Sequence, residues 1–121
     1  MRRSRDRDRL HLLHMRDAAQ WARDGAIGHS RNDLDTNRHF QLGLVKAVEL
    51  VDECASRISE ELRTQQTSIP WSKMISMRDV LVHNYWRVEP DTVWNVVQKD
   101  IPVLLIELER LIELEEERRM E

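Results

Sequence analysis

Glycine and proline, the residues that most often end regular secondary structure, are scarce in this chain. Only three of each occur among 121 residues, so little of the chain can form tight turns. Long helices need few such residues, whereas a sheet of many strands needs a turn after almost every strand. A chain of this length supports one hydrophobic core. The sequence therefore predicts an all-α protein that folds as a single helical bundle.

Apolar residues recur at the spacing of an amphipathic helix in the first half of the chain. A first helix is expected over residues 9–24, and Gly25 and Gly28 should end it. A second, longer helix should begin at Asp35 or Thr36 and run to about Arg63. The predicted buried stripe of the first helix consists of Leu10, Leu13, Ala18, Trp21 and Ala22. That of the second helix consists of Phe40, Leu44, Ala47, Val48, Val51, Ala55, Ile58 and Leu62.

The second half of the chain predicts further helices. One should begin near Pro70, because the first turn tolerates a missing N–H, and run through residues 77–88. Pro90 disfavours the helical conformation in the residue before it, so a new helix should start near residue 91. Asp100 is expected to cap the last helix, which contains a leucine-rich stripe. Together these elements predict an up-down bundle of about four to five helices with antiparallel neighbours.

Charge is unevenly distributed along the chain. Residues 1–23 contain seven arginines against three aspartates, and residues 107–121 contain seven glutamates against three arginines. We expect a basic leader over residues 1–8, either disordered or a charged helix start, a domain over 9–114 and an acidic tail over 115–121. A basic leader can contact phosphates, but a solvated charged surface explains the same pattern.

Cysteine and histidine usage restricts the possible chemistry. Cys54 is the single cysteine, which excludes an internal disulfide and fits a reducing compartment. No apolar run has the length of a membrane span, and no signal-peptide pattern occurs, so we expect a cytoplasmic protein without membrane contact. His11 and His14 lack a carboxylate at ligand spacing, and His29 and His39 flank a loop. No metal site and no cofactor are therefore expected.

The segment "MRDVLVHNYW", residues 77–86, places hydrogen-bonding side chains among aliphatic ones. On a helix, Asp79 and His83 are four residues apart and can meet on one face, so the carboxylate would hold the imidazole. Arg78 adds a permanent charge and a planar fork suited to phosphate, and Tyr85 adds a hydroxyl. These groups suit metal-free phosphodiester cleavage, with a base for the ribose 2′-hydroxyl and a cation for the phosphorane.

Helix geometry restricts how these groups can act together. Arg78 and His83 differ by about 140° around an ideal helix, so they do not stack on one another. Either the helix loosens near Asn84, or the arginine reaches around, or a second copy completes the site across a two-fold axis. The non-catalytic alternative is that these polar residues cap the helix or form ion pairs.

The spacing R-x-x-x-x-H-x-Y resembles the motif of the HEPN superfamily, and in particular of its HepT-like branch. The likeness extends to "MRDAAQWARDG", to "AVELVDECASRISEELR" and to the stretch from "IPWSKM" to "LERLI", so that about residues 9–114 are covered. The resemblance implies a HEPN-like helical bundle that forms a two-fold homodimer or a higher even oligomer.

The same resemblance implies a function. It predicts a metal-independent ribonuclease toxin of a toxin–antitoxin pair, with RNA bound in a cleft between two copies of the motif. Arg78 and His83 would be the catalytic residues, and Asp79 the polar residue beside the arginine. The antitoxin would be a small nucleotidyltransferase of the MntA type that transfers AMP to Tyr85. Asn84 and Trp86 would border the cleft and contact RNA.

Departures from the family pattern leave a second hypothesis open. The sequence "VDEC" and Ser76 stand where the family often has glycine. Asp52 and Glu53 add acidic charge to the second helix, and the formal net charge of the chain is −3. Acidic charge facing the cleft would weaken the attraction for RNA. The alternative is therefore a catalytically silent HEPN dimer that serves as a docking subunit for a nucleotidyltransferase.

Overall fold

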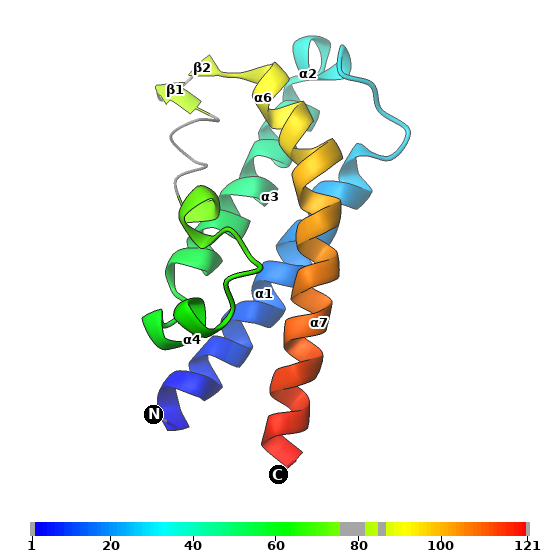
Figure 1. Cartoon of the computed structure of the whole chain (residues 1–121). Helices are drawn as coiled ribbons and strands as arrows, with labels where there is room; N and C mark the ends of the chain where they lie inside the picture. The colour runs from blue at the N-terminus through cyan, green and yellow to red at the C-terminus, as the bar shows by residue number, and fades with distance from the viewer. Residues whose placement is uncertain (1, 76–81, 85–86, 121) are drawn as a thin grey trace.

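A computed structural model describes residues 2–75, 82–84 and 87–120 of the chain. Its three long helices are α1 (Arg2–Ala26), α3 (Arg38–Ser56) and α7 (Ile101–Met120). Helix α1 packs against α3 and also against α7 (Figure 1). The predicted all-α, up-down bundle is confirmed. The described helices include none that is long and apolar enough to cross a membrane.

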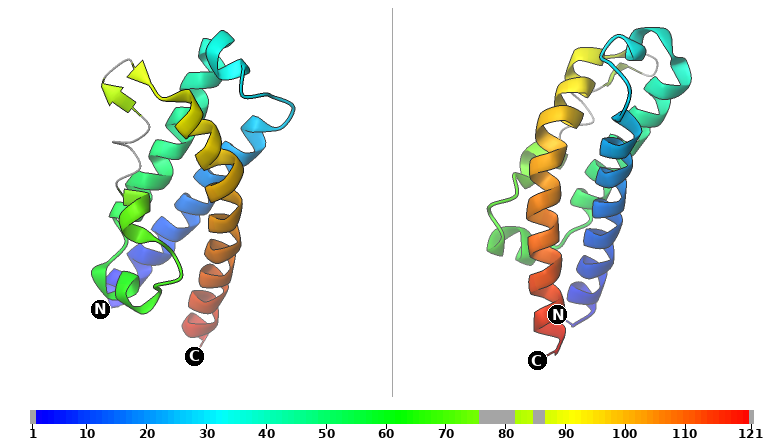
Figure 2. Two further views of the ribbon diagram at one scale, coloured as in Figure 1. Left: turned by 45° about the horizontal axis from the view of Figure 1, so that its top comes forward. Right: turned by 90° about the vertical axis from the view of Figure 1, so that its right-hand side faces the viewer.

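Shorter elements complete the described part of the chain. They are α2 (Asp33–Thr36), α4 (Glu60–Gln65), a helical segment over residues 71–75, β1 (Val82–Asn84), β2 (Arg87–Val88), α6 (Pro90–Asn95) and the π-helix η1 (Val96–Asp100). Both ends of the chain lie at one end of the bundle (Figure 1). The hairpin β1–β2 lies at the other end, together with α2 and α6 (Figures 1 and 2).

The buried face of α1 differs from the predicted one. Leu10 is 49% exposed and Trp21 is 61% exposed, whereas Ala18 and Ala22 are buried as predicted. Alanine side chains let neighbouring helices approach closely, and an indole ring would not fit between helices at that distance. The buried positions follow the alternating three- and four-residue spacing of helices packed along a seam. Those with this spacing are Leu12, Met15, Ala19, Ala22 and Ala26, and Ala18 is buried beside them.

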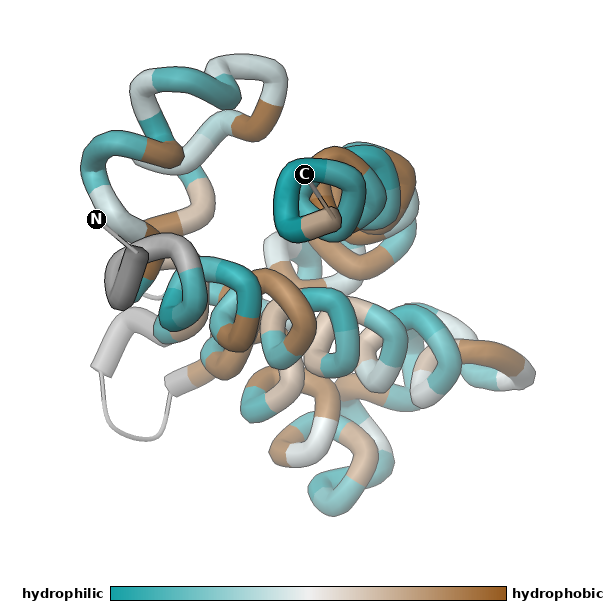
Figure 3. Tube along the Cα trace, turned by 90° about the horizontal axis from the view of Figure 1, so that it is seen from below, coloured by the Kyte–Doolittle hydropathy of each residue, from teal (hydrophilic) through white to brown (hydrophobic). Residues whose placement is uncertain are grey.

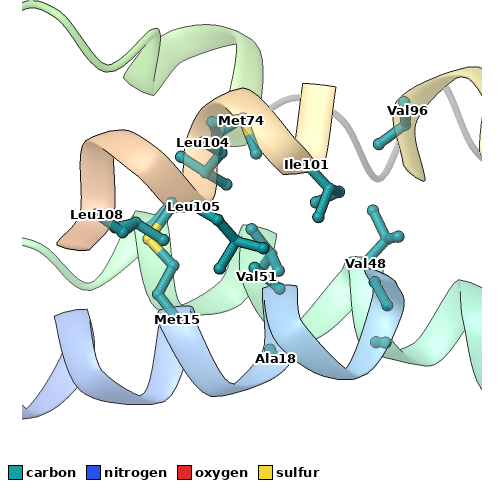
Figure 4. Close-up of a cluster of buried hydrophobic side chains, with 14 of the residues drawn as sticks. Met15, Ala18, Val48, Val51, Met74, Val96, Ile101, Leu104, Leu105 and Leu108 are labelled. Carbon is teal, nitrogen blue, oxygen red and sulfur yellow. The ribbon is translucent and has the colours of Figure 1, made fainter. Parts of the chain in front are cut away.

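Side chains from several helices meet in the centre of the bundle (Figure 4). Met15 of α1, Val51 of α3, Leu105 and Leu108 of α7, and Met74 of the 71–75 segment lie together there, each 5% exposed or less. Burying one such side chain contributes about 1.5–3 kcal/mol. In the view along the helices from below, hydrophobic and hydrophilic residues alternate around the turns of α7 (Figure 3). Leu104, Leu108 and Leu111 of α7 are buried in the core, whereas Val103 and Ile106 of the same helix are exposed.

Two ion pairs border the contact between α1 and α7. Arg9 Nε lies 2.5 Å from Glu116 Oε1, and Arg16 Nε lies 3.8 Å from Glu109 Oε1. The two arginines are seven residues apart on α1, and the two glutamates are seven residues apart on α7. The pairs therefore match one antiparallel register over two helical turns.

The single helix predicted from about residue 35 to residue 63 is wrong: α2, α3 and α4 occupy this range. The chain leaves the helical conformation before α3 and again before α4, and a polar residue caps each new start. Asn37 accepts a hydrogen bond from the Phe40 N–H at 3.0 Å, and Ser59 Oγ accepts one from the Leu62 N–H at 3.2 Å. These two short polar side chains therefore divide an otherwise continuous apolar stripe.

Asp8 of α1 explains why the break before α4 is stable. The residue is 4% exposed, and its carboxylate accepts hydrogen bonds from the Ser59 N–H at 2.8 Å and from Ser59 Oγ at 2.5 Å. Ser59 is thereby held in an extended conformation, with φ −61° and ψ 149°. Helix α1 thus stabilises the start of α4 through one buried side chain.

Residues 90–120 form α6, η1 and α7 without a break, so the predicted cap at Asp100 is wrong. The Ile101 N–H donates to the carbonyl oxygen of Val96, five residues earlier, as in a π-helix. Pro102 gives the physical reason. It lacks an N–H, and in an α-helix its ring would clash with the carbonyl four residues before it. A wider π turn just before the proline relieves that crowding.

The prediction of one helix from Pro70 through the motif is wrong at residues 82–84, which form the strand β1. β1 and β2 pair in antiparallel fashion there, with Val82 opposite Val88. Valine favours extended structure, and Pro90 disfavours the helical conformation in Glu89, which has φ −98° and ψ 91°. His83 and Asn84 therefore lie on an extended strand.

Candidate active site

The residues predicted to act on RNA fall partly outside the described part of the chain. His83 and Asn84 have their backbone in β1. Because β1 is extended, the argument that four-residue spacing on a helix brings Asp79 toward His83 does not apply. Their pairing stays a prediction. Outside the described residues lie Arg78, Asp79, Tyr85 and Trp86.

The chain that leads into the motif is fixed on the bundle. Trp71 is 7% exposed, and its Nε1–H donates to the carbonyl oxygen of Gln66 at 2.8 Å. Met74 is 1% exposed in the core. Lys73 Nζ lies 3.6 Å from Asp100 Oδ1 of η1. The segment before the motif is therefore held both by burial and by polar contacts.

The chain that follows the motif is fixed by a contact that the sequence did not predict. Arg31 Nε donates to Asp91 Oδ1 of α6 at 2.6 Å, and Arg31 Nη1 donates to Asp35 Oδ2 of α2 at 3.0 Å. These bonds, the first one foremost, raise the pKa of Arg31. Val88 and Trp94 are half-buried against the core. Arg31 and Asp91 are 60 residues apart, and no local pattern connects them.

The two acidic residues of the stretch "VDEC", Asp52 and Glu53, have different surroundings. Asp52 is 6% exposed in α3. Glu53 is exposed, and its Oε1 accepts a hydrogen bond from Arg57 Nη2 at 3.0 Å. One of these charges is thus buried and the other is paired. This weakens the argument that surface acidity on this helix repels RNA.

His29, which flanks the loop after α1, lies at the surface and is held by two contacts. Its Nδ1 lies 3.0 Å from Asp33 Oδ2, and its ring stacks on Phe40 with centroids 4.0 Å apart. Asp33 also accepts from the Ser30 N–H at 2.9 Å. The Ser30 hydrogen bond, with help from His29, lowers the pKa of Asp33. This cluster orders the loop between α1 and α2.

The remaining titratable candidates offer no assembled site. Burial, followed by the charge of Arg57, lowers the pKa of His11. Cys54 is half-buried, and burial raises the pKa of its thiol, which opposes a role as a nucleophile at neutral pH. Within residues 2–75, 82–84 and 87–120, three or more His, Cys, Asp or Glu side chains nowhere gather as metal ligands would.

An open apolar groove lies between α1 and α3. Its cavity has a volume of about 310 Å³. Trp21 and Gly25 border it from α1, and Phe40, Gly43 and Leu50 border it from α3. The described residues that line it belong to α1 and α3, and it is a second surface to be explained.

A sequence profile of the family described as "Ribonuclease HepT-like" matches residues 15–111. The matched range covers the whole Arg78–Tyr85 motif and each long helix at least in part. No solved structure matches the chain at the level of significance reached by the sequence relatives.

Three curated proteins illustrate the sequence similarity. A protein of Methanocaldococcus jannaschii, named a gamma-glutamylcyclotransferase and, provisionally, an RNase, is 27% identical over 87% of this chain and 47% of its own length. "Probable ribonuclease HepT" of Thermococcus cleftensis is 32% identical over 65% of this chain and 72% of its own length. A provisionally named RNase of Caldanaerobacter subterraneus is 24% identical over 88% of this chain and 96% of its own length. The chain thus spans about half the length of the first of these relatives.

Proposed function

The chain belongs to the HepT-like ribonuclease family, and on that premise we propose that it is a metal-independent ribonuclease, the toxin of a toxin–antitoxin pair. The observation that carries the proposal is the family match over residues 15–111, which includes the complete motif from Arg78 to Tyr85. The names of the three relatives, each of which includes a ribonuclease or RNase assignment, support the same reaction class. The proposed site of action is the cytoplasm.

In the proposed reaction, the ribose 2′-hydroxyl attacks the adjacent phosphorus. His83 takes the hydroxyl proton as general base, and Arg78 stabilises the negative charge that develops on the phosphorane. Asp79 orients these two groups. The bond from phosphorus to the 5′-oxygen breaks, that oxygen takes a proton from water as it leaves, and His83 returns its proton to the solvent. The products are a 2′,3′-cyclic phosphate and a free 5′-hydroxyl.

We place the site between two copies of the chain. Two motifs related by a two-fold axis would supply an arginine from one copy and a histidine from the other, and RNA would lie in the cleft between them. Asn84 and Trp86 are the proposed contacts to bound RNA. The buried segment before the motif and the Arg31 contact after it support this arrangement, because catalytic groups need a rigid support.

Cleavage of labelled RNA by the purified chain tests the proposal. Wild-type protein should cleave single-stranded RNA in the presence of a metal chelator, and His83→Ala and Arg78→Ala should each abolish cleavage. Ile106→Ala, a change at an exposed position of α7, should cleave like the wild type. A wild-type chain that leaves RNA intact under chelator, and is harmless when expressed alone, would instead be the silent docking subunit.

The proposed regulation acts on the motif tyrosine. A nucleotidyltransferase antitoxin of the MntA type would catalyse attack of the Tyr85 hydroxyl on the α-phosphorus of ATP, with pyrophosphate as the leaving group. The added phosphate would repel the RNA backbone and fill the cleft. Mass spectrometry of the chain after incubation with the enzyme encoded beside it, and ATP, should find one added AMP. Labelling that persists in Tyr85→Phe would place the modification elsewhere.

A further inference from the structure

The groove between α1 and α3 is not used by the proposed chemistry, and one large exposed side chain stands at its edge. Trp21 is 61% exposed, beside a hollow of about 310 Å³ that is lined mainly by apolar groups. An isolated hydrophobic residue at a surface needs no explanation. An aromatic ring beside an apolar hollow, however, offers a surface on which another flat or apolar group can pack. The charges around the hollow indicate which kind of group fits.

The ionisable side chains that line the groove are basic. They are His39 and Lys46 of α3, and both are exposed. No carboxylate of the described residues lines the hollow. Within the described part of the chain, Lys46 has no ion-pair partner, so its charge is available to a ligand. The lining therefore favours an occupant that carries negative charge beside an apolar or aromatic group.

The acidic residues near Trp21 do not change this balance. On α1, Asp17 stands four residues before Trp21, and Asp24 stands three residues after it. Neither lines the groove. Asp17 Oδ1 lies 3.4 Å from Arg16 Nη2. Asp24 Oδ1 lies 3.0 Å from Arg23 Nε. Each of these carboxylates thus has a cation beside it.

Basic side chains continue along the same faces of the two helices. Arg57 lies eleven residues beyond Lys46, about three turns along α3, and His14 lies two turns before the tryptophan on α1. Both are exposed. Burial, then the charges of Arg57 and His14, lower the pKa of His11, so these side chains from two helices are neighbours. Glu53 offsets part of the Arg57 charge, which leaves Lys46 as the stronger cation.

The basic surface is long enough for more than one nucleotide. From His39 to Arg57 it extends over eighteen residues, or about 27 Å at 1.5 Å per residue. Helix α1 packs against α3 along this length (Figure 2). Single-strand binding sites commonly extend over about 4–16 nucleotides. The two helices together therefore provide a surface on the scale of a short single strand.

Gly43 leaves room for a flat ring in the hollow. It lies in the middle of α3 and borders the groove. Glycine weakens a helix interior relative to alanine, so its presence calls for a reason. A Cβ atom at this position would meet nothing within 4 Å, and the backbone φ is not positive. Neither packing within the chain nor backbone geometry requires glycine here, and the space is available to a ligand.

We propose that the groove between α1 and α3 binds single-stranded RNA, with an unpaired base stacked on the Trp21 indole and a phosphate beside Lys46. The choice of RNA rests on the proposed function, but the site is separate from the motif. An aromatic side chain next to cations is the usual arrangement for binding single strands of any sequence, because every base has a face that can stack. The bases of a duplex are stacked on one another and are not available to the indole.

NMR titration with a short RNA whose 2′-hydroxyls are methylated tests the site directly. Such RNA lacks the nucleophile of the proposed reaction and is not cleaved. The indole Nε1–H signal of Trp21, identified by its absence in Trp21→Phe, should shift as RNA is added. Trp71 is the internal control, because it is 7% exposed and its Nε1–H donates to the Gln66 carbonyl oxygen. Its signal should stay in place.

Fluorescence anisotropy with the same RNA, labelled, measures what each part of the groove contributes. Trp21→Ala should weaken binding by about tenfold, and Trp21→Phe should lose less because a ring remains. Gly43→Leu should also weaken binding, since leucine fills the space of the base, while its higher helix propensity keeps the melting temperature from falling. Ile106→Ala removes an apolar side chain that is 70% exposed on α7. It is the matched control and should bind like the wild type.

Salt dependence tests the phosphate contact. Lys46→Ala should weaken binding and reduce the slope of log affinity against log salt by about 0.7, the value for one phosphate of a single strand. Arg119→Ala loses the same charge at an exposed position near the end of α7 and should leave the slope unchanged. A duplex of the same RNA should bind with an affinity that Trp21→Ala does not alter.

Three results would overturn the proposal. The first is a Trp21 signal that stays in place when RNA is added. The second is a pair of variants, Trp21→Ala and Lys46→Ala, that bind RNA like the wild type. The third is a Trp21 signal that moves when the protein alone is diluted but not when RNA is added, which would make the groove a protein–protein contact.

The proposed function is tested separately. A chain whose Trp21 signal shifts with methylated RNA, but that leaves unmodified RNA intact, would support the groove and refute the ribonuclease. Cleavage of unmodified RNA without a shift of the Trp21 signal would support the ribonuclease and overturn the groove.

Discussion

Replacing Asp8 by alanine should destabilise the whole domain, although this residue lies near the start of the chain. Asp8 is 4% exposed, and its carboxylate accepts hydrogen bonds from both the N–H and the hydroxyl of Ser59. The substitution removes both bonds at once and leaves the start of α4 without its contact to α1. Helix α4 precedes the segment that leads into the motif, so the effect should spread beyond the substituted helix.

The magnitude follows from the two bonds that are lost. A hydrogen bond to a charged group contributes about 1.5–3 kcal/mol net. Ser59 is half-buried, so water can replace part of what is lost, and its own cap to Leu62 persists. We expect a loss of about 2–3 kcal/mol in the free energy of unfolding, which lowers the melting temperature by about 10 °C for a domain of this size.

Urea denaturation followed by circular dichroism measures this loss. Asp6→Ala is the matched control, since Asp6 is an exposed aspartate on the same helix and its removal changes the net charge equally. A double-mutant cycle with Ser59→Ala should give a coupling energy of about 1 kcal/mol or more. If Asp8→Ala costs no more than Asp6→Ala, the carboxylate is not needed to hold α4. Deletion of residues 1–8 should cost at least as much as Asp8→Ala.

Three further outcomes are expected. Leu108→Ala should lose about 2–5 kcal/mol of unfolding free energy in urea titrations, because its side chain is 0% exposed; a loss below about 1 kcal/mol would contradict this packing. Cys54 should react slowly with Ellman's reagent at neutral pH, since burial raises its thiol pKa. A reaction as fast in the folded protein as in the unfolded protein would contradict that burial. NMR titration should find the pKa of Asp33 below that of an unstructured aspartate, since Ser30 and His29 stabilise its charged form. Its contribution to loop stability is therefore complete above the unfolded pKa and is lost as the pH falls through the lower, folded value.

The periodicity of the sequence predicted the helical bundle but misplaced parts of its surface. The stripe through Phe40, Val48 and Val51 identified the buried face of α3, because α3 has an unambiguous polar side. Helix α1 is apolar or small on more than one side, so Leu10 and Trp21 fitted a stripe as well as the alanines did. The side of α1 that is buried is the side that contacts both α3 and α7. Those contacts are made in the folded bundle and cannot be read from the sequence of α1 alone.

The candidate site likewise has features that neighbouring residues predict and features that depend on residues far apart in the sequence. The motif residues could be named from their spacing and from the family resemblance. The hairpin that pairs Val82 with Val88 could not be predicted. The four-residue spacing suggested a helix, whereas valine and Pro90 favoured an extended chain. The contact of Arg31 with Asp91 depends on the folded arrangement of α2 and α6. The spacing thus identified the motif residues, whereas only the folded structure showed which contacts fix the segments before and after the motif.

The position of the two chain ends has a consequence for fusion and tethering. Both ends lie at the end of the bundle opposite the hairpin (Figure 1). The 25 residues of α1 span about 37 Å at 1.5 Å per residue. A second domain or a purification tag joined to either end would thus be attached roughly one helix length from His83. The relative from Methanocaldococcus jannaschii, of which this chain matches 47%, carries additional sequence. An attachment at these ends would leave the hairpin end of the bundle open.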